Sequence, residues 1–152
     1  MSRLITIEDL YQFKFLSRPR ISPDGQRVAF VVTTIDERKH EYRSSIWVVP
    51  SEGGKANRFI GGKANARTPS WSPDGRWLAF VTEREGEAPD ASKAVGADVS
   101  YPAPMYRPDD KKQRGKGKGQ VWLMPTDGGE AHQLTFMPHG ATHPTWSPDS
   151  QR

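Results

Sequence analysis

The feature that most constrains the fold is a short motif that occurs three times. Residues 71–81 read Trp-Ser-Pro-Asp-Gly-Arg-Trp-Leu-Ala-Phe-Val, residues 21–31 are an edited copy 50 positions earlier, and residues 146–150 begin another copy 75 positions later. Serine, proline and glycine at these positions favour a type I turn, and Asp24 and Asp74 can bond nearby backbone. The runs after the turns are apolar on both faces, which is typical of strands covered on two sides.

Further strands follow each copy at matched positions. The first repeat continues with strands expected at 27–33, 45–50 and 56–60, and the second with strands expected at 121–125 and 131–135. Trp122 repeats Trp47 at the same offset of 75 that relates Trp146 to Trp71. Blade packing therefore explains the tryptophans better than ligand stacking does. A short helix over residues 6–14, capped by Thr6, is expected to precede the repeats and to cover an exposed edge.

Four-stranded antiparallel units at a period of about 45 to 50 residues are typical of β-propeller blades. The predicted fold is all-β: an incomplete β-propeller with two four-stranded antiparallel blades, the start of a third and a short N-terminal helix. We divide the chain into an N-terminal helical extension (1–15) and a partial propeller (16–152), with blade 1 at 16–60, blade 2 at 67–135 including an insertion at 84–118, and the start of blade 3 at 143–152.

The third copy stops at Arg152 inside its first hairpin, and fewer than four blades cannot close a ring. We therefore expect a longer protein, in which the 152 residues need partner surface to stay folded. Hydrophobic residues make up only 34% of the chain, beside 14 Gly and 13 Pro, which suits a turn-rich β protein. The absence of cysteine excludes disulfides and thiolate metal sites.

The N-terminus lacks the long apolar region of a signal peptide, and no stretch approaches the length of a membrane span. We therefore expect a cytoplasmic protein without a membrane partner. The net charge of +4 is concentrated in the insertion.

The blade pattern also carries a family resemblance. Pro-x-Trp-Ser-Pro-Asp-Gly, then Leu-Ala-Phe-Val, then Ile-Trp-Val-Val-Pro and Gly-Gly, resembles the propeller of the prolyl oligopeptidase family of serine peptidases. Residues 6–11, directly before a first blade, and residues 106–109 are similar to the acylaminoacyl-peptidase branch. The resemblance implies a propeller that admits short or unfolded peptides to a C-terminal α/β-hydrolase domain with a Ser, Asp and His triad.

The chain itself has no Gly-x-Ser-x-Gly nucleophile elbow, so no catalytic residue is transferred to it. We expect no cofactor, and no peptide hydrolysis by these residues alone. The partners implied are the remaining blades, the hydrolase domain, a peptide substrate and a second copy in a homo-oligomer. The alternative is a non-enzymatic TolB-like scaffold for protein binding, which would carry an export signal and an α/β domain ahead of the blades.

Other candidate sites are weak. A zinc site at His132, His139 and His143 is disfavoured because Gly140 and Pro144 argue against a helix, and a loop between blades fits better. Residues 111–118 carry five positive charges without aromatic residues, which indicates a solvated loop and no nucleic-acid partner.

Residues 115–119 and 61–63 are glycine-rich but match neither a dinucleotide fingerprint nor a phosphate loop. The aromatic segment 101–107 inside the insertion is a weaker functional candidate. Loops of such length are often functional, so this segment is predicted to line the substrate entrance or a subunit contact.

Overall fold

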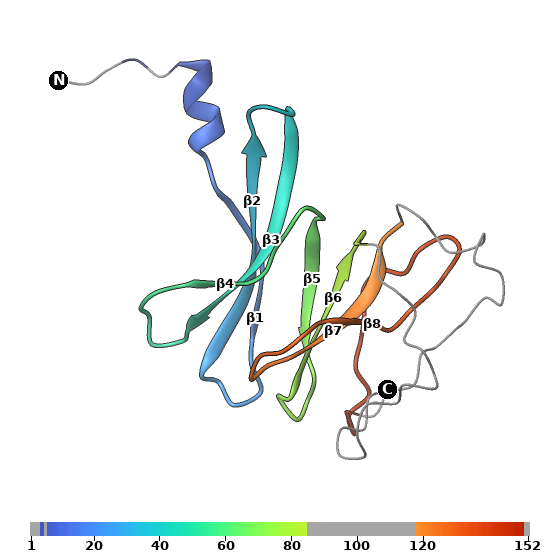
Figure 1. The fold of residues 1–152 in the computed structure, drawn as a ribbon. Coiled ribbons are helices and arrows are strands. Elements are labelled where there is room, and N and C mark those ends of the chain that lie inside the picture. The colour runs from blue at the N-terminus through green and yellow to red at the C-terminus, as the bar shows by residue number, and fades with distance from the viewer. Residues whose placement is uncertain (1–3, 5, 85–117, 151–152) are drawn as a thin grey trace.

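The protein is built from two four-stranded antiparallel sheets, as a computed structural model of residues 4, 6–84 and 118–150 shows (Figure 1). Each sheet follows chain order, β1-β2-β3-β4 and β5-β6-β7-β8. The strands are β1 (Phe15–Ile21), β2 (Arg27–Asp36), β3 (Glu41–Pro50), β4 (Asn57–Ile60), β5 (Ala66–Trp71), β6 (Trp77–Thr82), β7 (Gln120–Pro125) and β8 (His132–Gln133). This architecture confirms the predicted fold, and the two sheets are called blade 1 and blade 2 below.

The strand registers of the two blades match. Phe30 of β2 lies opposite Trp47 of β3, and Phe80 of β6 lies opposite Trp122 of β7. The pairs are related by the offsets of 50 and 75 residues that the sequence repeat gives. The blades are therefore copies at the level of single cross-strand pairs.

The repeated turn is held by a small hydrogen-bond network. In blade 2 the Gly75 N–H donates to the Ser72 carbonyl at 2.9 Å, which closes a four-residue turn with Gly75 at a φ of 73°. The Ser72 hydroxyl accepts from the Trp77 N–H at 2.9 Å and donates to the Asp74 carboxylate at 2.5 Å. The Arg76 N–H also donates to that carboxylate, at 3.0 Å. The carboxylate thus ties the turn to the start of β6.

These contacts determine the ionisation of the turn carboxylates. Burial raises the pKa of the Asp74 carboxyl, but the hydrogen bonds from Ser72 and Arg76 outweigh it and leave the pKa below its ordinary value. In blade 1 the hydroxyl of Ser22 is the main cause that lowers the pKa of Asp24, followed by the N–H of Gln26. Both aspartates therefore act as turn formers, in agreement with their predicted role.

The main hydrophobic core lies between the blades. Strand β6 is buried at every position, as predicted for a strand covered on two sides. One of its faces meets blade 1 in a cluster of Ala29, Val31, Ile46, Ala66, Trp71, Leu78, Phe80 and Trp122. Its other face packs with β7 and is covered by Leu134, Ala141 and Trp146. Blade 2 is thus packed between blade 1 and the segment that leads into the third copy.

Blade 1 is covered more fully on one face than on the other. Ala29 and Val31 of β2 are buried against blade 2, whereas on the other face Val32 is buried and Val28 and Phe30 are half-buried. Every residue of β1 is exposed. The prediction that residues 28–31 are covered on two sides is therefore met on one side, because the described residues supply a single neighbouring blade.

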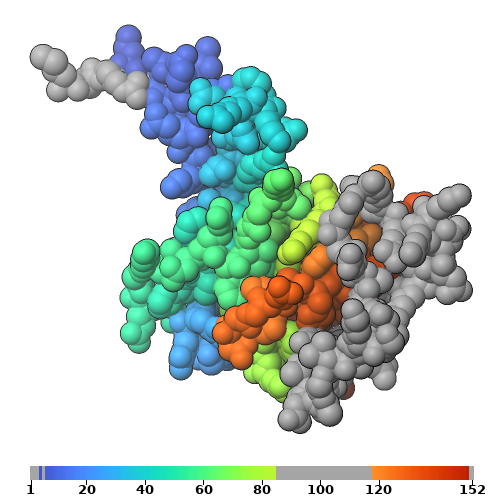
Figure 2. Space-filling model, viewed as in Figure 1, coloured from blue at the N-terminus to red at the C-terminus, as the bar shows by residue number. Residues whose placement is uncertain are grey.

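The N-terminal helix is a 3-10 helix, Ile7–Gln12, shorter than the predicted 6–14. The Asp9 carboxylate accepts a hydrogen bond from the Thr6 N–H at 2.8 Å. The helix lies beside the tip of the β2–β3 hairpin, where the Tyr11 hydroxyl contacts His40 Nδ1 at 3.2 Å, and both project from the blades (Figure 2). Leu10 stays 47% exposed, so the helix does not bury an apolar face against a sheet edge within the described residues.

The fourth strand of blade 2 is shorter than the predicted 131–135. Strand β8 ends at Gln133, and the Leu134 N–H still donates to the Val121 carbonyl at 2.8 Å. Beyond it, the Thr135 hydroxyl accepts from the Val121 N–H at 2.9 Å and donates to the Gln120 side-chain oxygen at 2.9 Å. A side chain thus replaces a ladder hydrogen bond.

Candidate functional site

The first strands of successive blades lie side by side. The Trp71 indole N–H donates to the Arg20 carbonyl at 3.0 Å and links β5 to β1. The Trp146 indole N–H donates to the Ser70 carbonyl at 3.1 Å and links the third copy to β5. In a propeller, sheets of this kind are arranged around a central channel. We therefore treat the side formed by β1, β5 and residues 141–146 as the channel-facing edge, where a function of the chain is expected.

Each first strand is interrupted at the same position. Arg18, Thr68 and His143 adopt left-handed backbone conformations, with φ of 52°, 52° and 54°. The pairing of β1 with β2 shifts between Ser17 and Arg20, and that of β5 with β6 shifts between Arg67 and Ser70. The two register shifts are β-bulges, which re-aim side chains. Since Arg18, Thr68 and His143 are related by the repeat offsets, the left-handed residue recurs in all three copies.

The bulges surround a small cavity of about 180 Å³. Side chains from β1, from β5 and from the third copy share its walls, so three successive blades contribute to it. The polar residues that line it are Arg18, Arg20, Thr68, Ser70, His143 and Thr145. None of the lining residues is acidic.

Two cations of this cavity have no counter-ion among the residues that the structure describes. Arg20 donates only to the Pro19 carbonyl, at 3.4 Å, and no carboxylate of the described ranges lies within ion-pair distance of Arg18 or Arg20. Arg67, on the neighbouring stretch of β5, is instead paired with Glu83. The Thr68 hydroxyl is buried without a hydrogen-bond partner. The cavity is therefore lined by positive charge, and one of its lining residues has a hydroxyl without a partner.

A second, larger hollow of about 1290 Å³ lies between the outer parts of the two blades. Phe59, Phe80 and Met124 contribute apolar lining, while its polar residues carry both signs of charge, for example Lys63 and Glu130. Because the charges are mixed, this groove carries no clear preference for an anion or a cation.

The histidines weighed as zinc ligands do not come together. Among the residues that the structure describes, no group of three His, Asp or Glu side chains could hold a metal ion. His132 packs edge-on against Trp77, with ring centroids 5.5 Å apart, and burial lowers the pKa of its imidazole. His139 is exposed, and His143 belongs to the channel-side cavity.

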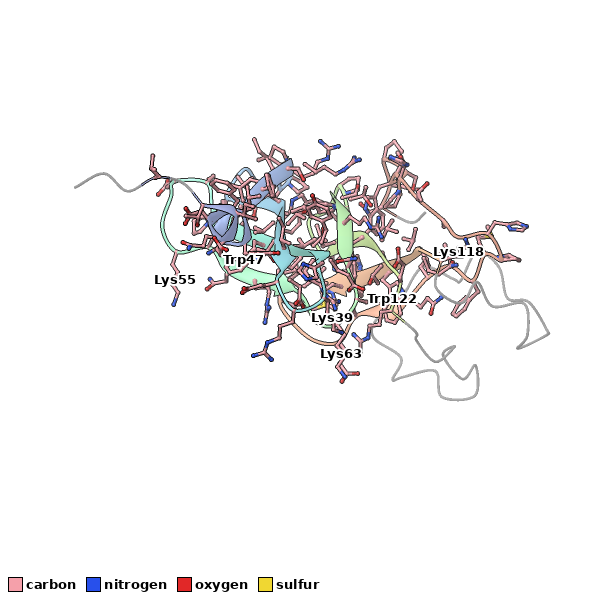
Figure 3. All side chains as sticks on the ribbon, turned by 90° about the horizontal axis from the view of Figure 1, so that it is seen from above. Lys39, Trp47, Lys55, Lys63, Lys118 and Trp122 are labelled. Atoms are coloured by element: carbon pink, nitrogen blue, oxygen red, sulfur yellow. The ribbon has the colours of Figure 1, made fainter. Side chains whose placement is uncertain are left out.

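The remaining sequence candidates carry no site in the described ranges. Residues 101–107 and 111–117 lie outside them, and Lys118 is exposed. Residues 61–63 lie between β4 and β5 with no helix after them. Figure 3 shows Lys55 and Lys118 at opposite ends of the molecule, so these two lysines do not share one basic face. No helix of the described residues is long and apolar enough to cross a membrane.

Sequence reasoning missed the channel-side cavity. A proline inside a strand is a signal for a bulge. Pro19 and Pro69 each follow a bulged residue, and Pro144 follows the left-handed His143. The signal was therefore present three times in the sequence.

Comparison with known proteins places the blades in a family. Residues 22–85 match the family model described as the dipeptidyl peptidase IV (DPP IV) N-terminal region. Over 151 residues, 99% of the chain, it is 32% identical to the uncharacterized peptidase YuxL of Bacillus subtilis. The chain is a segment of a prolyl oligopeptidase-family propeller. This propeller segment spans 18% of the length of YuxL.

Two further comparisons concern a second relative and a solved structure. The propeller segment is 27% identical over 86 residues to dipeptidyl-peptidase 5 of Porphyromonas endodontalis, which covers 57% of this chain and 12% of that protein. Its fold matches that of the Pyrococcus horikoshii acylaminoacyl peptidase with a TM-score of 0.58 and 20% identity, over 93% of this chain and 17% of the other. At that level of identity the match shows the fold.

Proposed function

We propose that this propeller segment gates substrate access in a serine peptidase that cleaves short peptides or removes acylated N-terminal residues. The observation that carries the proposal is the match of nearly the whole chain to a peptidase, together with a fold shared with an acylaminoacyl peptidase. Catalysis is assigned to an α/β-hydrolase domain outside these 152 residues. The partners proposed are that domain, the remaining blades, a peptide and a second copy of the protein.

The blades serve this role by forming a rigid wall. Blade 2 is buried on both faces, and each link from a tryptophan to the preceding first strand fixes the spacing of neighbouring blades. A channel wall with fixed spacing admits an extended chain and excludes a folded domain. Selection by size therefore follows from inter-blade packing rather than from any single side chain.

The experiment is a length series of substrates given to the full-length protein. We expect hydrolysis of short acylated peptides, inhibition by a serine-directed fluorophosphonate, and little cleavage of a folded protein that contains the same sequence. Equal cleavage of the folded protein would contradict gating. Absence of any hydrolysis, with stable binding of another protein, would favour the TolB-like scaffold instead.

We also propose a cytoplasmic location. Cell fractionation tests it, and recovery of the protein outside the cytoplasm would overturn it.

A further inference from the structure

We propose that the cavity between the first strands, lined by Arg18, Arg20, Thr68 and His143, binds the carboxylate group of a peptide. This inference rests on the proposed function, because it concerns a peptide that passes the channel-facing edge. A carboxylate site would make the channel select peptides by their charge as well as by their size.

The charge of the edge is the first argument. Arg18 and Arg20 lack a carboxylate partner within the described ranges, and the residues of β1, β5 and 140–146 include no Asp or Glu. Guanidinium groups bind carboxylates through paired, charge-assisted hydrogen bonds. The edge therefore attracts an anion and supplies the donors that a carboxylate needs.

The Thr68 hydroxyl is the second, independent argument. A buried hydroxyl without a partner is unfavourable, because it has given up its hydrogen bonds to water. The Thr68 Oγ1 atom is in that condition, on a residue that lines the same cavity as the two arginines. A carboxylate oxygen in the cavity would give this hydroxyl an acceptor.

The size of the cavity limits the ligand. A water molecule takes a share of roughly 30 Å³ in the liquid, so about 180 Å³ accommodates a group of a few heavy atoms. That volume suits a carboxylate and its nearest carbon atoms, and it is too small for a whole peptide. The carboxylate can belong to the C-terminus of the peptide or to an Asp or Glu side chain.

The test is a binding measurement on the full-length protein after treatment with a serine-directed fluorophosphonate, which prevents cleavage. Fluorescein-labelled peptides are compared by anisotropy in three forms: a neutral sequence with a free C-terminus, the same sequence amidated, and the amidated sequence with one internal Glu. We expect the amidated neutral peptide to bind about tenfold more weakly than either of the others. If the internal Glu restores the affinity that amidation removed, the site accepts any carboxylate. If it does not, the site is specific for the C-terminal carboxylate. Equal affinity of all three peptides would overturn the proposal.

The arginines are tested by the double variant Arg18→Gln/Arg20→Gln, with Lys55→Gln/Arg58→Gln as the matched control. Both variants remove two positive charges from blade 1, but Lys55 and Arg58 lie at or beside β4, at the edge of the sheet opposite β1. We expect the first variant to abolish the preference for the carboxylate peptides and the control to retain it. The same loss in both variants would indicate only a general effect of net charge.

Thr68 is tested by Thr68→Val and Thr68→Ser. Valine keeps the shape but lacks the hydroxyl, so we expect it to weaken carboxylate binding severalfold without lowering resistance to urea, whereas serine should preserve binding. Unchanged binding by Thr68→Val would remove the hydroxyl from the site. Hydrolysis of the amidated neutral peptide is measured in parallel with protein that has not been treated with the fluorophosphonate. Absence of hydrolysis would count against the proposed function. The binding measurements test the cavity separately.

Discussion

The indole N–H of Trp71 donates to the backbone carbonyl of Arg20 at 3.0 Å, and this contact joins the first strands of the two blades. Trp146 repeats it toward Ser70 at 3.1 Å. Trp71 is 8% exposed and also stacks under Arg27, whose guanidinium carbon lies 5.0 Å from the ring centroid. One side chain therefore combines apolar burial, a cation–π contact and a hydrogen bond across a blade junction.

Trp71→Phe should lower the free energy of unfolding by about 1 to 2 kcal/mol, because it removes the indole donor of the hydrogen bond to the Arg20 carbonyl. Trp47→Phe is the control, since the Trp47 indole donates to Ser45 within the same strand and not across blades. Urea unfolding of both variants measures the difference. A smaller loss for Trp71→Phe than for Trp47→Phe would contradict a special role of the inter-blade contact.

Phe80 and Phe30 occupy the same position in blades 2 and 1, but Phe80 is 2% exposed and Phe30 is half-buried. In the full-length protein Phe80→Ala should lower the free energy of unfolding by about 3 to 5 kcal/mol. Phe30→Ala should lower it by a similar amount, because a further blade would cover Phe30. Urea unfolding of the two full-length variants measures both losses, and a distinctly smaller loss for Phe30→Ala would show that no blade packs on that face.

Asp74→Ala should destabilise the fold by about 1 kcal/mol at neutral pH, because the buried Ser72 hydroxyl and the Arg76 N–H lose their acceptor. Since the pKa of Asp74 is lower in the fold than in the unfolded chain, its contribution is present above the unfolded pKa of 3.8 and is lost as pH falls through the folded value. Asp127→Ala, at an exposed turn of the same blade, is the control for charge. Equal stabilities of the two variants would rule out the turn network as the cause.

His132 should make stability depend on pH in a higher range than Asp74 does. Burial lowers the pKa of this imidazole below 6.5, so the fold takes up a proton less readily than the unfolded chain does. Stability is therefore full above about pH 6.5 and decreases as the pH falls below that value. His132→Asn, which installs the residue found at the equivalent position 57, should reduce the decrease between pH 7.5 and 5.5. His139→Asn, the same change at an exposed site, should leave it intact.

The blades could be predicted from the sequence because their signals are local and repeated. The turn residues, the apolar runs after them and the matched tryptophans each require only a few neighbouring positions, and the copies agree with one another. Strand ends were less predictable. β8 ends at Gln133, and the Thr135 hydroxyl after it accepts from the Val121 N–H of β7, a contact that depends on the neighbouring strand and not on the local sequence. The helix differed for a similar reason, since its neighbour is a hairpin tip and not a sheet edge.

The channel-side cavity could not be predicted from residue types alone. The residue before a proline normally prefers extended backbone, so Arg18, Thr68 and His143 would be expected in that region, whereas all three are left-handed. Their side chains meet only because three blades stack, and stacking is a tertiary relationship. The prolines marked the bulges, but not which side chains the bulges would bring together.

Ile21 stands where Trp71 and Trp146 stand in the other copies, and an isoleucine has no N–H to donate. The junction on the far side of blade 1 must therefore be held without the indole contact that fixes the other two. In a closed ring this would be the joint that opens most easily. Ile21→Trp would supply the missing indole donor at that junction.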